Sequence, residues 1–241
     1  KTRPGAFDHS SNATLGTFNF NPHSRNEITG MDRITARKMT AAEIERANPP
    51  GETEPVTYLS GVKTLRRKAR QFAYREFTLA GPVGLGAWRE AWTLPFDGGW
   101  PPEVDISEAS GDDIYRHHVN YHTLGTNPNG HGSTPHGGGW SILPNGLTLH
   151  DSIKYGCEKT PTELRYDTAG IHTHETANAD YMESYPVIGV AVGGSQTSDF
   201  ITPAGPASPD TFSMDWRYRQ WVRPSLIAYG PNITAKPQLN L

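Results

Sequence analysis

Cysteine is nearly absent from this chain, and so are a dominant charge and a long apolar run. Cys157 is the single cysteine among 241 residues, so no disulfide can form within the chain. The formal net charge is only -3, and the lack of a long basic segment argues against nucleic-acid binding. No apolar run approaches the about 20 residues of a membrane span, and no signal peptide is recognisable. We therefore expect neither a nucleic-acid nor a membrane partner.

Glycine and proline, by contrast, are abundant, with 25 and 20 residues. Apolar residues make up 35% of the chain, which is enough for a sizeable core. Turn residues between many short apolar segments are typical of an all-β fold. Because no internal repeat or linker is visible, we expect one domain, residues 1–241, folded as an all-β sandwich.

One helix and a series of strands are predicted along the chain. Thr40 and Glu43 form a capping-box pattern that opens a short helix, and Pro49 and Pro50 end it. Residues 1–30 lack clear periodicity, so we expect them to wrap the surface or to add an edge strand. The predicted strands are residues 56–65, 72–79, 88–94, 103–108, 119–124, 163–166, 171–174, 187–192 and 212–218.

Three acidic residues, Glu103, Asp105 and Glu108, fall within six positions of one predicted strand. Like charges on one strand face repel, so stability gives no reason to collect them. Simple alternation places Glu103 and Asp105 on one face and Glu108 on the other. A β-bulge near Ile106 and Ser107 would return Glu108 to the shared face, and bulges are common beside active sites.

The spacing of Glu103 and Glu108 indicates a chemistry. With the bulge, their backbones lie roughly 13 Å apart and inward-leaning carboxyls about 5 Å apart. Retaining glycosidases need about 5–5.5 Å, whereas inverting ones need about 6.5–9.5 Å. The spacing therefore favours one carboxylate as nucleophile and the other as acid and base. An exposed acidic strand or a calcium site remains the alternative interpretation.

The segment around these acids resembles glycoside hydrolase family 16, the laminarinase, agarase and carrageenase group. Family members carry a tryptophan-proline turn followed by an E-[I/V]-D-x-x-E strand, which residues 100–108 match. Other family-like segments follow in order from residue 34 to residue 218. They are Tyr58–Gly61, Gly86–Trp92, Tyr121–Gly125, Val190–Gly194 and Phe212–Tyr218.

This resemblance implies a concanavalin-like β-sandwich, or jelly roll, whose two curved antiparallel sheets form a concave substrate cleft. It also implies that Glu103 is the nucleophile, Asp105 its helper and Glu108 the acid and base. An endo-acting retaining hydrolase of a β-linked polysaccharide is the expected activity, with β-1,3-glucan favoured. A marine galactan such as agar or carrageenan, or a bacterial exopolysaccharide, is an alternative substrate. Transglycosylation, a non-catalytic binding module and a polysaccharide lyase are the alternative functions.

The same resemblance assigns substrate contacts. Trp88 and Trp100 are expected to stack on sugar rings, and His122 to lie near the acid/base. Glu76 is kept from a family motif and is taken as a further contact. Arg89 stands where proline is common, and two interpretations are open: contact with an anionic sugar or sulfate, or an ordinary arginine on the surface.

Other features depart from the family or lie outside the motif. Thr78 replaces a usual arginine, and Lys159 and Tyr166 stand where laminarinases usually have tryptophans, so the substrate is in doubt. Trp140 follows a glycine run and either caps the cleft or anchors the loop. Trp92 is expected in the core.

The expected cofactor and partner complement is small. We expect a secreted monomer that needs no cofactor and whose partner is a polysaccharide, with a structural calcium ion at Asp215 left open. The histidines lack the compact spacing of a zinc site, and Cys157 is expected to be a buried apolar residue. The histidines concerned are His117, His118, His122, His131 and His136.

Overall fold

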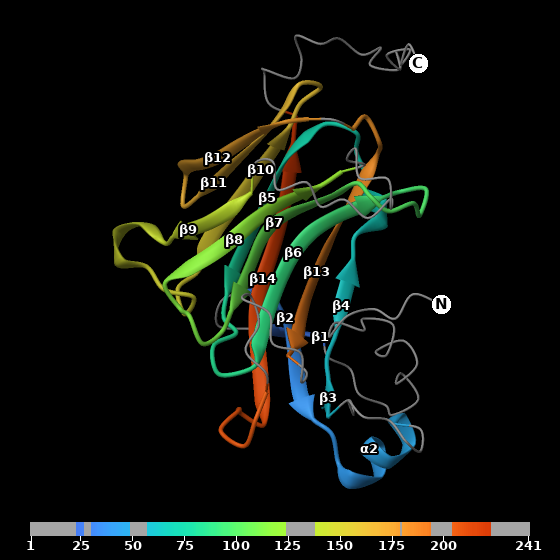
Figure 1. The fold of residues 1–241 in the computed structure, drawn as a ribbon, viewed down its shortest axis with the longest axis vertical. Helices are drawn as coiled ribbons and strands as arrows, with labels where there is room; N and C mark the ends of the chain where they lie inside the picture. Colours follow the sequence, from blue (N-terminus) through green and yellow to red (C-terminus); the bar gives the residue numbers. More distant parts are fainter. Residues whose placement is uncertain are drawn as a thin grey trace.

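The chain folds as two antiparallel β-sheets that pack face to face (Figure 1). The computed structural model describes residues 23–26, 30–48, 57–123, 138–178, 180–193 and 204–222. One sheet has eight strands, in the order β1-β2-β14-β5-β10-β11-β12 with β3 paired to β2. The other has six, in the order β4-β13-β6-β7-β8-β9. The predicted all-β sandwich is confirmed, while its extent over residues 1–241 as one domain stays a prediction.

The strands of the eight-stranded sheet come from all parts of the chain. They are β1 (His23–Asn26), β2 (Met31–Lys38), β3 (Tyr58–Leu59), β5 (Ala73–Ala80), β10 (Ile153–Lys159), β11 (Glu163–Thr168), β12 (Ile171–Ala177) and β14 (Thr211–Trp221). β11 and β12 form the predicted hairpin. β1 lies at the sheet edge, as expected for part of the N-terminal segment.

The six-stranded sheet carries the acidic motif on an inner strand. Its strands are β4 (Val62–Thr64), β6 (Ala87–Pro95), β7 (Glu103–Ser110), β8 (Arg116–His122), β9 (Gly139–Ile142) and β13 (Ser184–Val192). β7 lies between β6 and β8, so both of its edges are hydrogen-bonded. This pairing fixes the direction of every side chain on β7.

The one α-helix of the described residues, α2 (Ala41–Ala47), begins where the capping box predicts. Thr40 accepts from the backbone N–H of Glu43, and the Glu43 carboxylate accepts from the backbone N–H of Thr40. Two short 3₁₀ turns complete the helical structure of the described ranges, η2 (Arg66–Lys68) and η3 (Pro144–Gly146).

The strand predictions were incomplete in two ways. Residues 56–65 were predicted as one strand, but β3 and β4 belong to different sheets. β2, β9 and β10 were not predicted. In β10 the apolar residues Ile153, Tyr155 and Cys157 alternate with other residues, but this pattern is short and ends on a lysine, Lys159. His131 and His136 of the expected rim loop lie outside the described residues.

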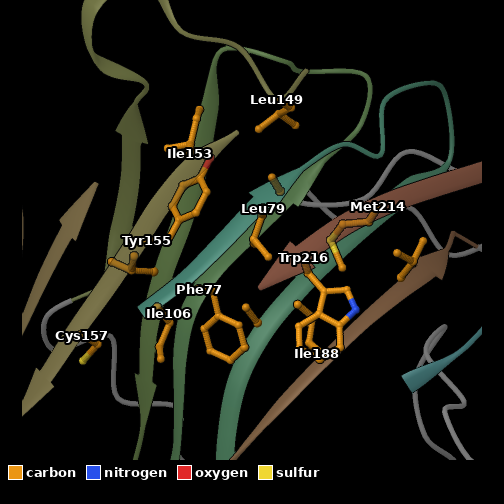
Figure 2. Packing of buried hydrophobic residues seen from close by; sticks show 14 of the residues in the cluster. Phe77, Leu79, Ile106, Leu149, Ile153, Tyr155, Cys157, Ile188, Met214 and Trp216 are labelled. Atoms are coloured by element: carbon orange, nitrogen blue, oxygen red, sulfur yellow. The ribbon is translucent and has the colours of Figure 1, made fainter. Parts of the chain in front are cut away.

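The core fills the space between the sheets (Figure 2). Phe77 and Tyr155 enter it from the eight-stranded sheet, and Ile106 and Ile188 from the six-stranded sheet. Cys157 is buried among them, as predicted, and burial raises the pKa of its thiol to about 12. Since burial of apolar surface drives folding, this layer holds the two sheets together.

Arg89 lies in this core, which contradicts its predicted contact with substrate. The side chain is fully buried, Nη2 donates to the Tyr155 hydroxyl at 2.5 Å, and the guanidinium lies 4.7 Å from the centre of the Tyr155 ring. His117 packs against the same ring and bonds Thr168 at 2.7 Å. Alternation along β6 explains the error, because Arg89 points inward while its neighbours Trp88 and Glu90 point outward. No helix among the described residues is long and apolar enough to cross a membrane.

Candidate active site

A bulge in β7 brings the predicted acids onto one face of the six-stranded sheet. Across the β6–β7 pair, Asp105 lies opposite Trp92 and Glu108 lies opposite Glu90. Trp92 and Glu90 are two residues apart on β6 and share a face, so Asp105 and Glu108 share it too. The register between β7 and β8 also shifts between Asp105 and Glu108. The predicted bulge is therefore confirmed, and we call this surface the carboxylate face.

Glu103 lies two residues before Asp105, on the carboxylate face, at the beginning of β7. The indole N–H of Trp100 donates a hydrogen bond to its carboxylate. Trp100 is 47% exposed, and its ring lies 5.8 Å from that of His122, with the planes tilted by 44°. The exposed indole of Trp100 thus orients Glu103 through a neutral N–H donor.

Burial and mutual repulsion dominate the electrostatics of Glu103 and Asp105. Burial raises the pKa of Asp105 well above its usual range, and the charges of Glu108 and Glu103 raise it further. Burial also raises the pKa of Glu103 to about 7, although hydrogen bonds from Trp100 and Asp105 lower it. The arrangement favours a protonated Asp105 that donates to an ionised Glu103.

His122 and His118 flank the acids from the adjacent strand β8. His122 Nε2 lies 3.0 Å from Asp105 Oδ2, and burial lowers the pKa of His122, which favours the neutral imidazole. His118 lies opposite Glu108, with Nδ1 3.7 Å from Glu108 Oε2. Each of these acids therefore has an imidazole from β8 beside it.

Trp140 extends the same surface onto β9. It lies opposite His118, with the two rings 5.2 Å apart. The guanidinium of Arg116 lies 4.1 Å from the centre of the indole ring. Of the two readings considered for Trp140, its place on β9 favours a side chain on the carboxylate face rather than a loop anchor.

Two further residues predicted to contact substrate, Glu76 and Trp88, are not exposed on the carboxylate face. Glu76 belongs to β5 and alternates with the core residue Phe77, so it points away from the sandwich on the far side of the eight-stranded sheet. The structure therefore does not bring Glu76, predicted as a substrate contact, to the carboxylate face. Trp88 has the register of the carboxylate face but is 2% exposed, so it offers no free ring for stacking. Trp92 is buried as expected, but in a small cluster on the carboxylate face rather than in the main core.

Lys159 and Tyr166, the two departures from the laminarinase pattern, are structural in this fold. Lys159 is buried and forms a 2.5 Å ion pair with Asp180. Tyr166 is buried in the main core, and its hydroxyl donates to the backbone oxygen of Asn120. Both side chains are buried, so neither offers a group for stacking on a sugar at the carboxylate face.

Sequence reasoning missed three members of the carboxylate face, Glu90, His118 and Asn120. A period-two pattern could have found them. Glu90 lies between Trp88 and Trp92 at that spacing, and His118 and Asn120 precede His122 at the same spacing.

Asp215, considered as a calcium ligand, forms an ion pair with Arg33 instead. Arg33 donates to both of its carboxylate oxygens, at 2.6 and 3.0 Å. Within the described ranges, no group of three or more His, Cys, Asp or Glu side chains is placed to hold a metal ion. These residues do not fit calcium at Asp215, and a structural calcium ion elsewhere stays a prediction.

Comparison with known proteins finds two curated relatives that are named as glycanases. The chain is 29% identical to the endo-1,3-1,4-beta-glycanase ExsH of Rhizobium meliloti over 184 residues, which cover 74% of this chain and 36% of that protein. The endo-1,3-1,4-beta-glycanase EglC of the same organism is 29% identical over 149 residues, or 59% of this chain and 30% of that protein. The chain thus spans about a third of the length of the curated relatives it matches. No protein-family model matches the chain.

Solved structures share the fold at lower identity. The laminarinase catalytic domain of Thermotoga maritima superposes with a TM-score of 0.67 at 21% identity, covering 84% of this chain and 81% of that one. SCLam, described as a non-specific endo-beta-1,3(4)-glucanase from family GH16, gives 0.60 at 21% identity, covering 79% and 71%. These likenesses define the class of fold, a jelly-roll sandwich. Together with the curated relatives, they confirm the resemblance to glycoside hydrolase family 16.

Proposed function

We propose that this chain is the catalytic domain of an endo-acting, retaining glycoside hydrolase that cleaves β-1,3-glucan. The observation that carries the proposal is the bulge in β7, which brings Glu103, Asp105 and Glu108 onto one face. The relatives named endo-1,3-1,4-beta-glycanase and the laminarinase neighbours support the glucan substrate. A mixed-linkage β-1,3-1,4-glucan is the second substrate that these names favour.

The first step forms a covalent intermediate on Glu103. An oxygen of the Glu103 carboxylate attacks the anomeric carbon while the glycosidic carbon–oxygen bond breaks. Glu108 gives its proton to the departing sugar oxygen. Asp105 keeps its own proton and donates a hydrogen bond to Glu103, which stabilises the ionised nucleophile before attack.

The second step releases the intermediate. Glu108, now a carboxylate, takes a proton from water, and the water oxygen attacks the anomeric carbon. The bond to Glu103 breaks, and the carboxylate is restored. Two displacements at the same carbon leave the anomeric configuration unchanged.

Stacking and location complete the proposal. The exposed ring of Trp100 beside Glu103 suits the apolar face of a pyranose. A polysaccharide is too large to enter a cell unaided, so we propose that the domain is secreted and acts outside the cell as a monomer.

A panel of polysaccharides digested by the wild type and by Glu103→Gln tests the proposal. β-1,3-Glucan should yield new reducing ends and short oligosaccharides, and the variant should lose at least about 10³-fold in rate. The first product, observed by proton NMR, should keep the β configuration. Wild-type turnover by Glu103→Gln, or a first product of inverted configuration, would contradict the mechanism.

A further inference from the structure

A pocket lies on the outer face of the eight-stranded sheet, on the far side of the sandwich from Glu103. Its volume is about 480 Å³, and β5, β10, β11 and the end of β14 form it. In Figure 1 these elements meet where β10–β12 approach the end of β14. We call it the outer pocket, and the proposed mechanism uses none of its residues. Those that the argument uses are Tyr74, Glu76, Lys154, Glu158, Arg165, Asp167 and Trp221.

Two aromatic rings form one side of the outer pocket. Trp221 lies opposite Tyr74 across the β14–β5 pair, with ring centres 4.6 Å apart and planes tilted by 43°. The Tyr74 hydroxyl donates to Asp167, with its two oxygens at 2.9 and 2.7 Å, so the tyrosine is held in place. Trp221 remains 41% exposed. A large apolar ring is thus kept in contact with solvent on a supported platform.

Gly156 makes room for the Tyr74 hydroxyl beneath the outer pocket. It lies on β10 between Glu76 and Asp167 in the sheet. A Cβ at this position would collide with the Tyr74 hydroxyl and approach Asp167. The missing side chain therefore allows Tyr74 and Asp167 to meet across the strand beneath the pocket.

Charged groups of both signs surround the aromatic platform. Glu76 lies 3.9 Å from Lys154, and Glu158 and Asp167 add two further carboxylates to the lining. Carboxylate oxygens accept hydrogen bonds from hydroxyls, and the lysine ammonium donates them. The lining holds these three carboxylates against two cations, Lys154 and Arg165, so its charges nearly balance and favour neither an anionic nor a cationic ligand. Among the described residues, no group of three or more His, Cys, Asp or Glu side chains is placed to hold a metal ion. A neutral ligand rich in hydroxyls, with an apolar face for Trp221, fits this combination.

We infer that the outer pocket binds a second segment of a neutral polysaccharide, with Trp221 stacking on a sugar ring and Glu76 and Glu158 accepting from its hydroxyls. The choice of β-1,3-glucan as this polysaccharide rests on the proposed function. Because the pocket and Glu103 lie on opposite sides of the sandwich, the two sites engage different chains or distant stretches of one chain. Attachment through the outer pocket raises the local concentration of polymer at the carboxylate face, as expected for bivalent binding.

Calorimetric titration of Glu103→Gln with a β-1,3-glucan hexasaccharide tests this inference, because the variant leaves the ligand uncut. Two sites per chain are expected. Adding Trp221→Ala should leave one site, and affinity for insoluble β-1,3-glucan particles should fall on the order of tenfold. Adding Glu76→Gln instead should weaken only the second site, which keeps the test valid if Trp221→Ala folds poorly.

Tyr115→Ala in the same background is the matched control, since Tyr115 is an exposed aromatic residue outside the pocket. It should keep both sites. Unchanged stoichiometry and particle affinity in Trp221→Ala would overturn the inference, as would equal losses in the control. If the carboxylate face binds no glucan at all, Glu103→Gln shows a single site that Trp221→Ala abolishes. That result would reject the proposed function and retain the outer pocket.

Discussion

The carboxylate face and the outer pocket both combine acidic residues with an exposed tryptophan, yet the acids are crowded together in one and paired with other groups in the other. On the carboxylate face three acids follow one another on β7 and Glu90 of β6 faces them, and burial and mutual repulsion raise the pKa of Glu103 and Asp105. In the outer pocket the acids come from separate strands, and a lysine and a tyrosine hydroxyl accompany two of them. Crowded, desolvated acids suit proton transfer and nucleophilic attack, whereas compensated acids suit binding.

Removal of the proposed acid/base, Glu108, should lower activity more than any substitution on the opposite sheet. We expect Glu108→Gln to lower kcat on β-1,3-glucan about 10²- to 10⁴-fold, because the departing oxygen loses its proton donor. An aryl glycoside whose leaving group needs no protonation should still glycosylate Glu103 at near the normal rate, with release of the phenolate. Burst kinetics with that substrate separates the two steps.

Glu175→Gln is the control for this comparison, since Glu175 is an exposed acid of the eight-stranded sheet. Its kcat should stay within about twofold of the wild type. If the rate at which Glu103 is glycosylated fell equally with the polysaccharide and with the aryl glycoside in Glu108→Gln, that result would argue against an acid/base role.

Substitutions in the core between the two faces should change the stability of the protein rather than its activity. Arg89→Ala should lower the free energy of unfolding by about 3 kcal/mol, because it leaves a cavity beside Tyr155. Arg89→Met should cost under about 1.5 kcal/mol, because it keeps the volume and removes a buried charge two of whose nitrogens lack hydrogen-bond partners. Denaturant titration measures both. A raised KM with unchanged stability in Arg89→Ala would instead restore the predicted substrate contact.

The pH dependence of activity should report the hydrogen bond between Asp105 and Glu103. Glu103 must be ionised to attack, so activity should fall as pH drops through its pKa of about 7. Asp105→Ala removes a donor that lowers this pKa, so the acidic limb of kcat/KM should move to higher pH by about 0.5–1 unit. Asp105→Asn keeps a donor of similar size and should leave the limb near its wild-type position. A shift to lower pH in Asp105→Ala would mean that Asp105 acts as a negative charge.

Several features of the fold and the candidate site could be predicted because their signals are local. The capping box of Thr40 and Glu43 begins α2 as expected, since both hydrogen bonds form within one turn. The bulge in β7 followed from the spacing of three acids that no stability argument would collect. Strand β10 was not predicted although Ile153, Tyr155 and Cys157 alternate at the spacing of a strand, since three apolar positions are a short signal and its place between β5 and β11 depends on distant segments.

The sequence by itself determined the class of fold, the acidic strand and the order of the motifs, since alternation and spacing are properties of neighbouring residues. Only the tertiary structure decided which face each strand turns to the core. It placed Arg89 inside the sandwich and Glu76 on its far side, and it brought Trp221 to Tyr74, 147 positions earlier in the chain. The physical reason is that strand alternation gives two faces but does not say which is buried. That choice depends on how two sheets, assembled from distant segments, cover each other's apolar surface.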